Sequence, residues 1–402
     1  MTKLTHAMHT LASIAAITAA MNLLGCASKP ASPDKTGAKA AMANHRPPMP
    51  FPSGSGDDFR GVSPAQVVNV FGEVNGAPGS SGALSGESAF QQHTFTDEGY
   101  DSDVAVDPTG KWLAFSSTRN SEHQGVYLQR VDGTAVTQLT DGNSDDAYPS
   151  FSPDGKQIAF SSTRAGNWQI FVMDVDGHNI TQMTSGPMQA VHPSFSPDGT
   201  RLVYCGMGGR SGQWELWTVD LKTGEKRTIG YGLFPTWSPD KSVDRIAFQR
   251  ARQRGSRWFS LWTMDLVDGE GRRATEVAVS ANAAILSPAW SPDGKRLAFT
   301  TIVQPGKGGA ARAKGQTDIW TIEPDGANRR RLTDGRGENL MPFWAADNRV
   351  YFVSDRGGAD CIWSVRAQPL APAPAPATAQ APPAKKDATV VGENDTRDVA
   401  PH

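Results

Sequence analysis

Short apolar triplets recur along the middle of the chain and dominate its hydrophobic pattern. The six triplets are Leu113-Ala114-Phe115, Ile158-Ala159-Phe160, Leu202-Val203-Tyr204, Ile246-Ala247-Phe248, Leu297-Ala298-Phe299 and Val350-Tyr351-Phe352. Consecutive strand residues point to opposite faces of a sheet, so a triplet with no polar position needs both faces covered. The pattern therefore predicts short strands in sheets that are packed on both sides.

A polar turn motif precedes each triplet and sets the repeat length. It reads Ser152-Pro153-Asp154-Gly155, Ser196-Pro197-Asp198-Gly199, Ser238-Pro239-Asp240-Lys241 and Ser291-Pro292-Asp293-Gly294, with degenerate copies at Asp107-Pro108-Thr109-Gly110 and Ala345-Ala346-Asp347-Asn348. Successive copies are 45, 44, 42, 53 and 54 residues apart. A period near 40–45 residues with several short strands per unit is typical of propeller blades. No helical periodicity appears within a unit, which excludes helical solenoids.

Each unit also contains a third strand after a polar loop. These strands are centred on Val126-Tyr127-Leu128, Ile170-Phe171-Val172, Leu216-Trp217-Thr218, Leu261-Trp262-Thr263, Ile319-Trp320-Thr321 and Ile362-Trp363-Ser364. Asp-Gly turns then lead to outer strands such as 136–140 and 330–333. The last unit lacks an outer strand, and residues 92–97 resemble one. We therefore expect an all-β, six-bladed propeller of four-stranded blades, with the ring closed by an N-terminal outer strand.

The N-terminus has the pattern of an export signal. An apolar stretch from Leu11 to Leu24 follows Lys3 and is too short to cross a bilayer as a mature helix. It ends in Leu23-Leu24-Gly25-Cys26, which looks like the lipobox of bacterial lipoproteins. That resemblance implies cleavage before Cys26, lipid attachment to its thiol and contact with the membrane through this anchor only. Ala27 rather than Asp follows Cys26, which favours the periplasmic side of the outer membrane.

Composition divides the chain into five segments. We expect a lipoprotein signal peptide at 1–25, a lipidated cysteine and flexible tether at 26–60, a lead-in of undetermined structure at 61–91, the propeller at 92–366 and a disordered Ala/Pro-rich tail at 367–402. The formal net charge is -2, which gives no indication of nucleic-acid binding. Three cysteines are too few for a disulfide framework. Cys205 and Cys361 belong to opposite blades, so we expect two buried, unreactive thiols.

The repeats resemble those of TolB-like proteins. The Pro-Asp turn, the continuation Ile158-Ala159-Phe160-Ser161-Ser162-Thr163-Arg164 and the ending Gln138-Leu139-Thr140-Asp141-Gly142 carry this resemblance. It implies a propeller that binds a peptidoglycan-associated lipoprotein or another envelope protein at one mouth of its central channel. Residues 61–91 are too few for the separate N-terminal domain that TolB proteins also carry.

Two sets of residues are candidates for binding a partner. Residues just before the first strand of each blade are expected to surround the channel mouth: Asp103, Tyr148, His192, Phe234, Ser287 and Met341. Cations in the blade-four and blade-five loops are expected to grip an anionic protein or glycan surface: Arg250, Arg252, Arg254, Arg257, Arg312 and Lys314. The recurring arginines Arg119, Arg164 and Arg356 are more simply explained as pairing with aspartates between blades to fix loops.

The sequence predicts a non-enzymatic binding scaffold with no cofactor and no metal. It contains no Gly-x-Ser-x-Gly nucleophile motif and no segment long enough for a hydrolase domain. The alternative is a carbohydrate-binding propeller, with Trp168, Trp214 and Trp258 available for stacking, or a metal-dependent oligosaccharide-processing enzyme. Such an enzyme needs three or four converging ligands, and only His192 is expected at a channel position.

Overall fold

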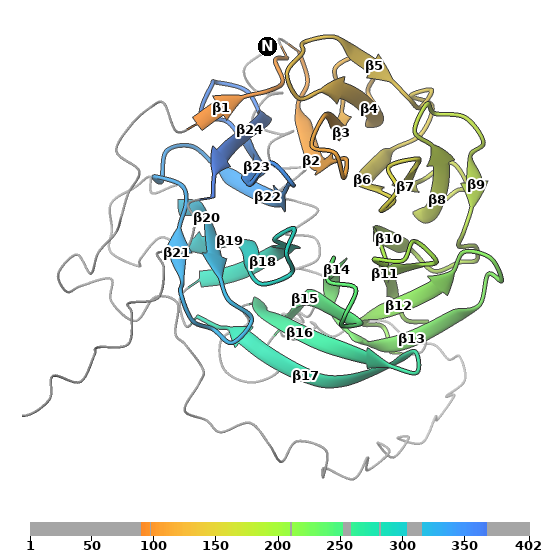
Figure 1. Cartoon of the computed structure of the whole chain (residues 1–402). Helices are drawn as coiled ribbons and strands as arrows, with labels where there is room; N and C mark the ends of the chain where they lie inside the picture. Colours follow the sequence, from red (N-terminus) through yellow and green to blue (C-terminus); the bar gives the residue numbers. More distant parts are fainter. Residues whose placement is uncertain are drawn as a thin grey trace, which may run out of the picture. The chain divides into compact units, whose positions relative to one another are not determined.

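The computed structural model of the protein describes residues 90–96, 98–209, 211–251, 259–280, 283–303 and 316–367. The predicted signal peptide, Cys26, the tether and nearly all of the lead-in and tail therefore lie outside the described residues. Within the described part, the strands form six four-stranded sheets arranged in a ring, as the sequence predicted (Figure 1). This part contains no helix long and apolar enough to cross a membrane.

Each sheet is one blade whose strands run in chain order from the channel to the rim. The blades are β2 (Asp101–Val106), β3 (Trp112–Ser117), β4 (Gly125–Arg130) and β5 (Val136–Gln138); β6 (Asp146–Phe151), β7 (Gln157–Ser162), β8 (Gln169–Asp174) and β9 (Thr181–Gln182); β10 (Ala190–Phe195), β11 (Arg201–Met207), β12 (Trp214–Asp220) and β13 (Lys226–Tyr231); β14 (Leu233–Trp237), β15 (Arg245–Ala251), β16 (Phe259–Val267) and β17 (Glu270–Ala278); β18 (Ala283–Trp290), β19 (Leu297–Val303), β20 (Gln316–Ile322) and β21 (Arg330–Arg331); and β22 (Asn339–Trp344), β23 (Arg349–Ser354) and β24 (Cys361–Arg366), completed by β1 (Phe90–Gln92).

The ring closes through the N-terminal strand, as expected from the missing outer strand of the last unit. Strand β1 pairs antiparallel with β24, with Gln92 opposite Trp363. The strand begins two residues earlier than the sequence indicated, and Phe95 lies beyond it with 60% of its surface exposed. Pairing nevertheless continues past β1, because the His93 N–H donates to the Ile362 carbonyl at 2.9 Å. No blade is left with an unpaired third strand.

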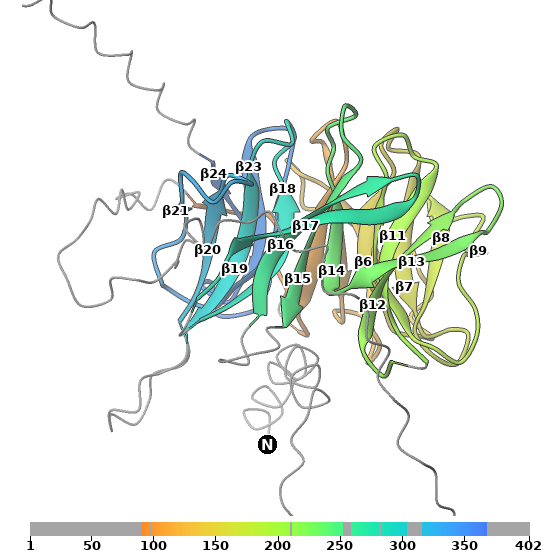
Figure 2. The ribbon, with the colours of Figure 1, turned by 90° about the horizontal axis from the view of Figure 1, so that it is seen from below.

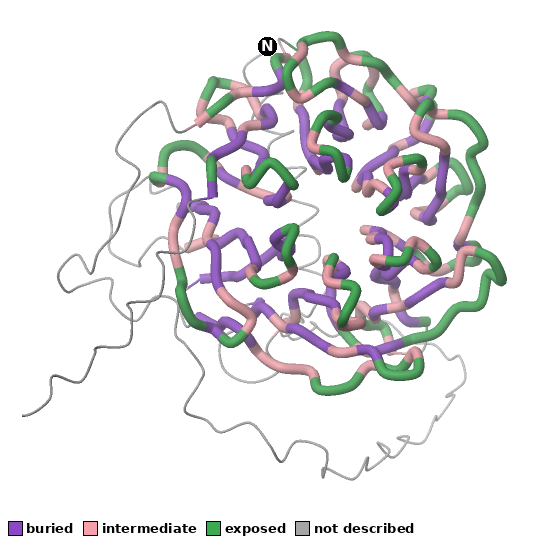
Figure 3. The backbone as a smooth tube through the Cα atoms, in the orientation of Figure 1, coloured by how far each residue is buried: buried purple, intermediate pink, exposed green. Residues whose placement is uncertain are grey.

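The second strand of every blade is sealed between its neighbours. All six apolar triplets are buried, and Leu113, Ala114 and Phe115 have no exposed surface. Their side chains lie in apolar clusters that each join residues of adjacent blades, which explains why both faces of these strands are hydrophobic. Figure 3 shows burial concentrated in the inner strands and exposure along the connecting turns.

The Ser-Pro-Asp-Gly motifs are turns between the first and second strands, and they all lie at one face of the ring, here called the turn face. In the second blade, the Ser152 hydroxyl donates to Asp154 at 2.6 Å and accepts the Gln157 N–H at 3.0 Å. Gly294 needs its left-handed φ of 67°, and a Cβ there would lie 2.8 Å from the Cβ of Asp240 in the preceding turn. Turn geometry thus accounts for the motif. Loops between the second and third strands, and those between blades, lie at the opposite loop face (Figure 2).

Candidate functional site

A β-bulge interrupts the innermost strand of all six blades at the same place. The pairing register with the second strand shifts between Ser102 and Ala105 in the first blade, and the other five blades shift at the equivalent position. The residues that begin these bulges are Asp103, Tyr148, His192, Phe234, Ser287 and Met341, the six that the sequence indicated for the channel mouth. They lie inside the first strands rather than before them, because each strand begins one to four residues earlier.

The backbone at these six positions is in the left-handed region, with φ between 50° and 60°. Non-glycine residues rarely adopt this conformation, and it persists only where the surrounding structure imposes it. In five blades the next residue is a proline, namely Pro149, Pro193, Pro235, Pro288 and Pro342. A residue before proline normally prefers an extended backbone. The ring therefore holds six residues in an unfavourable conformation that turns their side chains toward the channel.

Polar side chains from neighbouring blades hold the bulges in place. The His192 N–H donates to the Ser161 hydroxyl at 3.0 Å, and the Ser287 N–H donates to Gln249 Oε1 at 2.8 Å. Met341 N–H donates to the Thr300 hydroxyl at 3.2 Å. In each case the acceptor belongs to the second strand of the preceding blade. These three bulges are thus fixed by the blade before each of them, which couples the channel wall to the packing of the ring.

Cys205 has the equivalent position on β11, the second strand of the third blade, next to the bulge at Phe234. Its buried thiol interacts with the Phe234 N–H and lies 3.4 Å from the Val191 carbonyl oxygen. Burial raises the pKa of the Cys205 thiol to about 12 and also raises that of Cys361. Both thiols are free and buried, as the sequence predicted. At neutral pH they are protonated and poor nucleophiles.

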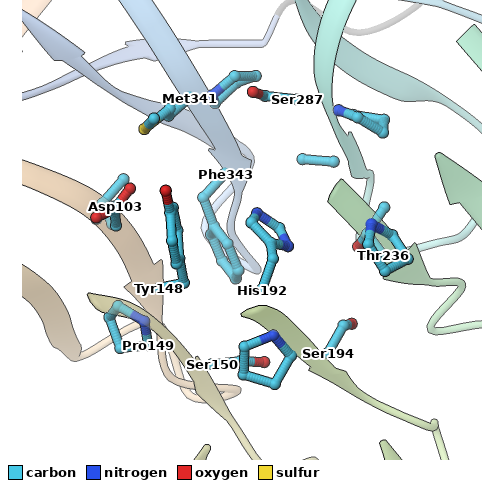
Figure 4. Close-up of a pocket in the computed structure, with 16 residues that line it drawn as sticks. Asp103, Tyr148, Pro149, Ser150, His192, Ser194, Thr236, Ser287, Met341 and Phe343 are labelled. Carbon is cyan, nitrogen blue, oxygen red and sulfur yellow. The ribbon is translucent and has the colours of Figure 1, made fainter. Parts of the chain in front are cut away.

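The bulges enclose a cavity of about 100 Å³ on the channel axis (Figure 4). Asp103, Tyr148, His192, Ser287 and Met341 line it, together with the five prolines and Phe343. Phe234 completes an aromatic cluster: its ring centroid lies 4.7 Å from that of His192 and 6.1 Å from that of Tyr148. Three aromatic rings from consecutive blades therefore meet in the channel.

Burial determines the charge inside this cavity. It raises the pKa of Asp103 to about 6, an effect partly offset by hydrogen bonds from the Ser102 hydroxyl, at 2.9 Å, and the Tyr148 N–H. Burial lowers the pKa of His192 to about 4 and raises that of the Tyr148 phenol. At neutral pH the lining thus carries one carboxylate, a neutral imidazole and a neutral phenol.

The recurring loop-face arginines have structural partners. Arg119 pairs with the fully buried Asp101 at 2.7 Å, and Arg164 pairs with the fully buried Asp146 at 3.1 Å. In the sixth blade, Arg356 donates to the Asn339 side-chain oxygen at 2.8 Å. The guanidinium groups also lie over aromatic rings of their own blades, for example 5.1 Å from the Phe115 centroid. These contacts support the interpretation that the arginines fix loops.

Of the six loop cations that are expected to bind a partner, the structure describes Arg250 alone. The Arg250 guanidinium lies 5.4 Å from the centroid of Trp262, which gives it a packing role on its own blade. Arg252, Arg254, Arg257, Arg312 and Lys314 lie outside the described residues. Their role in binding stays a prediction.

The described histidines do not converge. His192 lines the cavity, whereas His93 lies between the first and last blades, and His123 and His178 pair with Asp145 and Asp176. Among the described residues, no group of three or more His, Cys, Asp or Glu side chains is placed to hold a metal ion. Of the tryptophans proposed for sugar stacking, Trp168 and Trp214 are half-buried, and Trp258 lies outside the described part.

The bulges and the proline ring were not deduced from the sequence, although a signal was present. Tyr148-Pro149-Ser150, His192-Pro193-Ser194 and Phe234-Pro235-Thr236 share a residue-Pro-hydroxyl pattern, and the last two blades keep the proline. A proline inside a strand argues for a bulge or an edge. Applied at five equivalent positions, that rule locates the bulges.

Two family models match this ring. Residues 90–244 match the TolB β-propeller domain, and residues 176–372 match the N-terminal β-propeller domain of the Tricorn protease. A TolB homologue from Chlorobium luteolum is 41% identical over 75 residues, which is 18% of this chain and 17% of that protein. The Tol-Pal system protein TolB of Anaeromyxobacter dehalogenans is 30% identical over 137 residues, 33% of this chain and 27% of the relative. The matches thus span a minor part of each relative.

Solved structures that resemble this chain include propellers. The structure of a putative TolB from Agrobacterium tumefaciens has a TM-score of 0.49 and 19% identity, covering 67% of this chain and 91% of that one. Several propellers of enzymes have similar or lower TM-scores. The repeat motifs, the six-bladed ring and the family-model match together make the described part of this chain a TolB-like β-propeller.

Proposed function

We propose that this protein is a non-enzymatic binding scaffold of the cell envelope that captures a protein partner at its channel mouth. The observation that carries this proposal is the ring of six bulges: five of the six bulge residues line one cavity, and Phe234 packs against His192 and Tyr148. The bulge backbone is the same in every blade, whereas the side chains differ in chemistry. A uniform, rigid frame that presents varied groups at one opening is suited to recognition.

The partner is expected to be an envelope protein of the peptidoglycan-associated lipoprotein kind. Support comes from the relatives, several of which are named as TolB of the Tol-Pal system. The matched segments cover a minor part of those proteins, so this kind of partner is a proposal for the present chain. A glycan is a second, weaker candidate, because Trp168 and Trp214 have part of their surface exposed.

The location proposed for this function is the envelope, with the chain anchored through a lipid on Cys26. The apolar stretch before Cys26 supports export. The 63 residues between Cys26 and Phe90 would allow the propeller to reach partners tens of ångströms from the membrane.

A binding role accounts for the cavity better than catalysis does. Its lining has one carboxylate and one imidazole, but Tyr148 stands between Asp103 and His192 in Figure 4. The pKa shifts leave the carboxylate ionised and the imidazole neutral at pH 7, with no nucleophile among the lining residues that is activated by a base. The Tricorn protease model that matches part of the chain describes a propeller domain.

Site-specific photocrosslinking in intact cells tests the proposal. A photoreactive phenylalanine replaces Met341 at the channel, and a matched control replaces Val267, which is 49% exposed at the end of β16. We expect a discrete crosslinked envelope protein from position 341 and none from position 267. Identical patterns at both positions, or no adduct at 341, would contradict binding at the channel mouth.

The loop cations are tested separately. Reversal of Arg252, Arg254 and Arg257 to Glu should abolish or strongly weaken capture of the crosslinked partner while leaving the ring folded. Arg250 is left unchanged because its contact with Trp262 would confuse loss of binding with loss of packing. Unchanged capture by the triple variant would remove the basic loop from the binding surface.

A further inference from the structure

The cavity at the channel carries a charge that the described residues do not balance. Asp103 is the only acidic residue among its lining residues, and no lysine or arginine lines it. None of the ion pairs within the described part of the chain involves Asp103. An ionised carboxylate in a confined site is costly unless a cation meets it. The cavity therefore favours a positively charged ligand group.

The wall of the cavity supports the same sign of charge. Five of the six residues that follow the bulge positions are prolines, which have no N–H to donate. An anion would need converging N–H or O–H donors, and the wall lacks the backbone N–H at these five positions. His192 adds no charge at neutral pH, and its buried Nδ1 has no hydrogen-bond partner among the described residues. The remaining polar groups of the lining are the Tyr148 phenol and the hydroxyls of Ser150, Ser194, Thr236 and Ser287, each of which can accept a hydrogen bond from an ammonium group.

Aromatic rings add to this preference. Tyr148 and His192, whose centroids are 5.2 Å apart, border the cavity together with Phe343. The faces of Tyr and Phe attract ammonium groups within about 6 Å of their centroids. Tyr148 also stands next to Asp103 in Figure 4, so one ring face and one carboxylate address the same space.

We propose that this cavity binds a primary ammonium group, supplied by a lysine side chain of the partner segment that docks at the channel mouth. The inference rests on the proposed function for the source of the lysine, and on the cavity alone for the ammonium. About 100 Å³ is room for several water molecules by the same measure, which suits an ammonium and its last methylenes rather than a whole bulky residue. A calcium ion is a poorer fit, since it takes six to eight oxygen ligands that include carboxylates, and Asp103 is the one carboxylate among the lining residues.

Titration with n-butylammonium tests the ammonium site without any partner. Heteronuclear NMR or calorimetry on the purified full chain at pH 7.5 should show saturable binding in the millimolar range, which is reasonable for so small a ligand. Asp103→Asn should weaken it at least tenfold, because the carboxylate is lost. Asp132→Asn, at an exposed hairpin acid, is the matched control and should bind as the wild type does.

The variant is expected to fold, since asparagine keeps an oxygen that can accept the Ser102 and Tyr148 hydrogen bonds; its circular dichroism and unfolding transition verify this. Sodium butyrate and calcium chloride are the comparison ligands. The proposal is overturned by equal binding to wild type and Asp103→Asn, by no saturable binding to wild type, or by preferred binding of butyrate or calcium.

A last comparison separates this inference from the proposed function. If the Met341 crosslink to an envelope protein persists while n-butylammonium does not bind, only the ammonium site is wrong. If the amine binds but no crosslink forms, the partner at the channel mouth is wrong and the cavity takes a free amine. Lysine-to-glutamine substitution in the captured partner should lower its affinity for the wild type but not for Asp103→Asn.

Discussion

The guanidinium of Arg119 lies 2.7 Å from the carboxylate of Asp101, whose side chain has no exposed surface. This pair joins the loop after the second strand to the start of the innermost strand. The second blade repeats it with Arg164 and Asp146, and the sixth replaces the acid by Asn339. The loop face is therefore fastened to the channel strands by a buried polar contact in each of these blades.

Removal of the cation from this pair should destabilise the ring strongly. Arg119→Met leaves the Asp101 carboxylate buried without a partner, a change that typically costs about 3–5 kcal/mol. Asp101→Asn should cost less, because the sixth blade already uses an asparagine at this position. Urea unfolding at pH 7 measures both.

Arg130→Met is the matched control, because Arg130 pairs with Asp132 at the surface, where the two side chains are 51% and 71% exposed. Its effect should be within about 0.5 kcal/mol of zero. If Arg119→Met and Arg130→Met lowered stability equally, Asp101 would not depend on its arginine.

The two titratable groups in the channel should give opposite pH dependences. The pKa of His192 is about 4 in the folded protein, below the unfolded value of 6.5. Between these values the unfolded chain binds a proton that the folded chain does not, so stability is present above pH 6.5 and is lost as pH falls toward 4. The full shift corresponds to about 3 kcal/mol.

Asp103 acts with the other sign. Its pKa rises from 3.8 to about 6 on folding, so its contribution favours the folded state below pH 3.8 and is lost as pH rises through 6. Asp103→Asn should therefore be more stable than the wild type at pH 7.5, with the difference shrinking as pH falls from about 6 to about 4.

The contributions of His192 and Asp103 to the pH dependence of stability partly cancel in the wild type. Each contribution is therefore measured by comparing the wild type with a variant that lacks the group. The advantage of wild type over His192→Gln should fall by about 2–3 kcal/mol between pH 7 and pH 4.5 in urea unfolding experiments. His178→Gln, at a side chain that is 78% exposed, should run parallel to the wild type. Parallel curves for His192→Gln and wild type would show that His192 is not shielded from solvent.

The six-bladed ring could be predicted from the sequence because the same strand pattern recurs in each unit. Six apolar triplets need two covered faces, and a four-strand unit repeated six times meets that need only when blades stack around an axis. The displaced outer strand could be predicted because the last unit lacks an outer strand of its own. Its bounds could not, since the residues that resemble an outer strand, 92–97, include His93 and Thr94: the Thr94 hydroxyl accepts the Ile362 N–H of β24, and the His93 imidazole contacts the Val131 carbonyl of the first blade.

The site was less accessible to sequence reasoning. The six bulge residues were identified as a ring, but the left-handed backbone that orients them depends on hydrogen bonds that their N–H groups donate to residues such as Ser161 and Gln249 in the preceding blade. Those partners are 31 and 38 residues away along the chain, and no local pattern marks them. The charge balance of the cavity likewise depends on which side chains are absent from it.

His93 should control closure of the ring. Its imidazole contacts the Ser364 hydroxyl at 2.7 Å and the Val131 carbonyl at 3.1 Å, so it joins the last blade to the first. Burial lowers its pKa. His93→Ala should remove both contacts and leave a cavity, at a cost of about 2–4 kcal/mol.

Hydrogen exchange followed by mass spectrometry locates the effect. Amides of β24 should exchange faster in His93→Ala, whereas those of β11, on the opposite side of the ring in Figure 1, should change less. Uniform acceleration in all blades would indicate that the ring opens as one unit instead of at the junction of β1 and β24.

Lipidation of Cys26 is the prediction on which the envelope location depends. Cells fed a radiolabelled or alkyne-tagged fatty acid should label the wild-type protein and not Cys26→Ser. A stable lipid anchor should make the wild type pellet with membranes and resist salt extraction. Cys26→Ser should instead be found in the soluble fraction.

Cys361→Ala is the matched control for this experiment, because Cys361 is a free, buried thiol in the ring. Its removal should leave both labelling and membrane association unchanged. Fatty-acid labelling that survives Cys26→Ser would place the modification elsewhere. A labelled protein that fractionates as soluble would mean that the anchor does not hold the propeller at the membrane, and the partner would then have to be sought among freely diffusing envelope proteins.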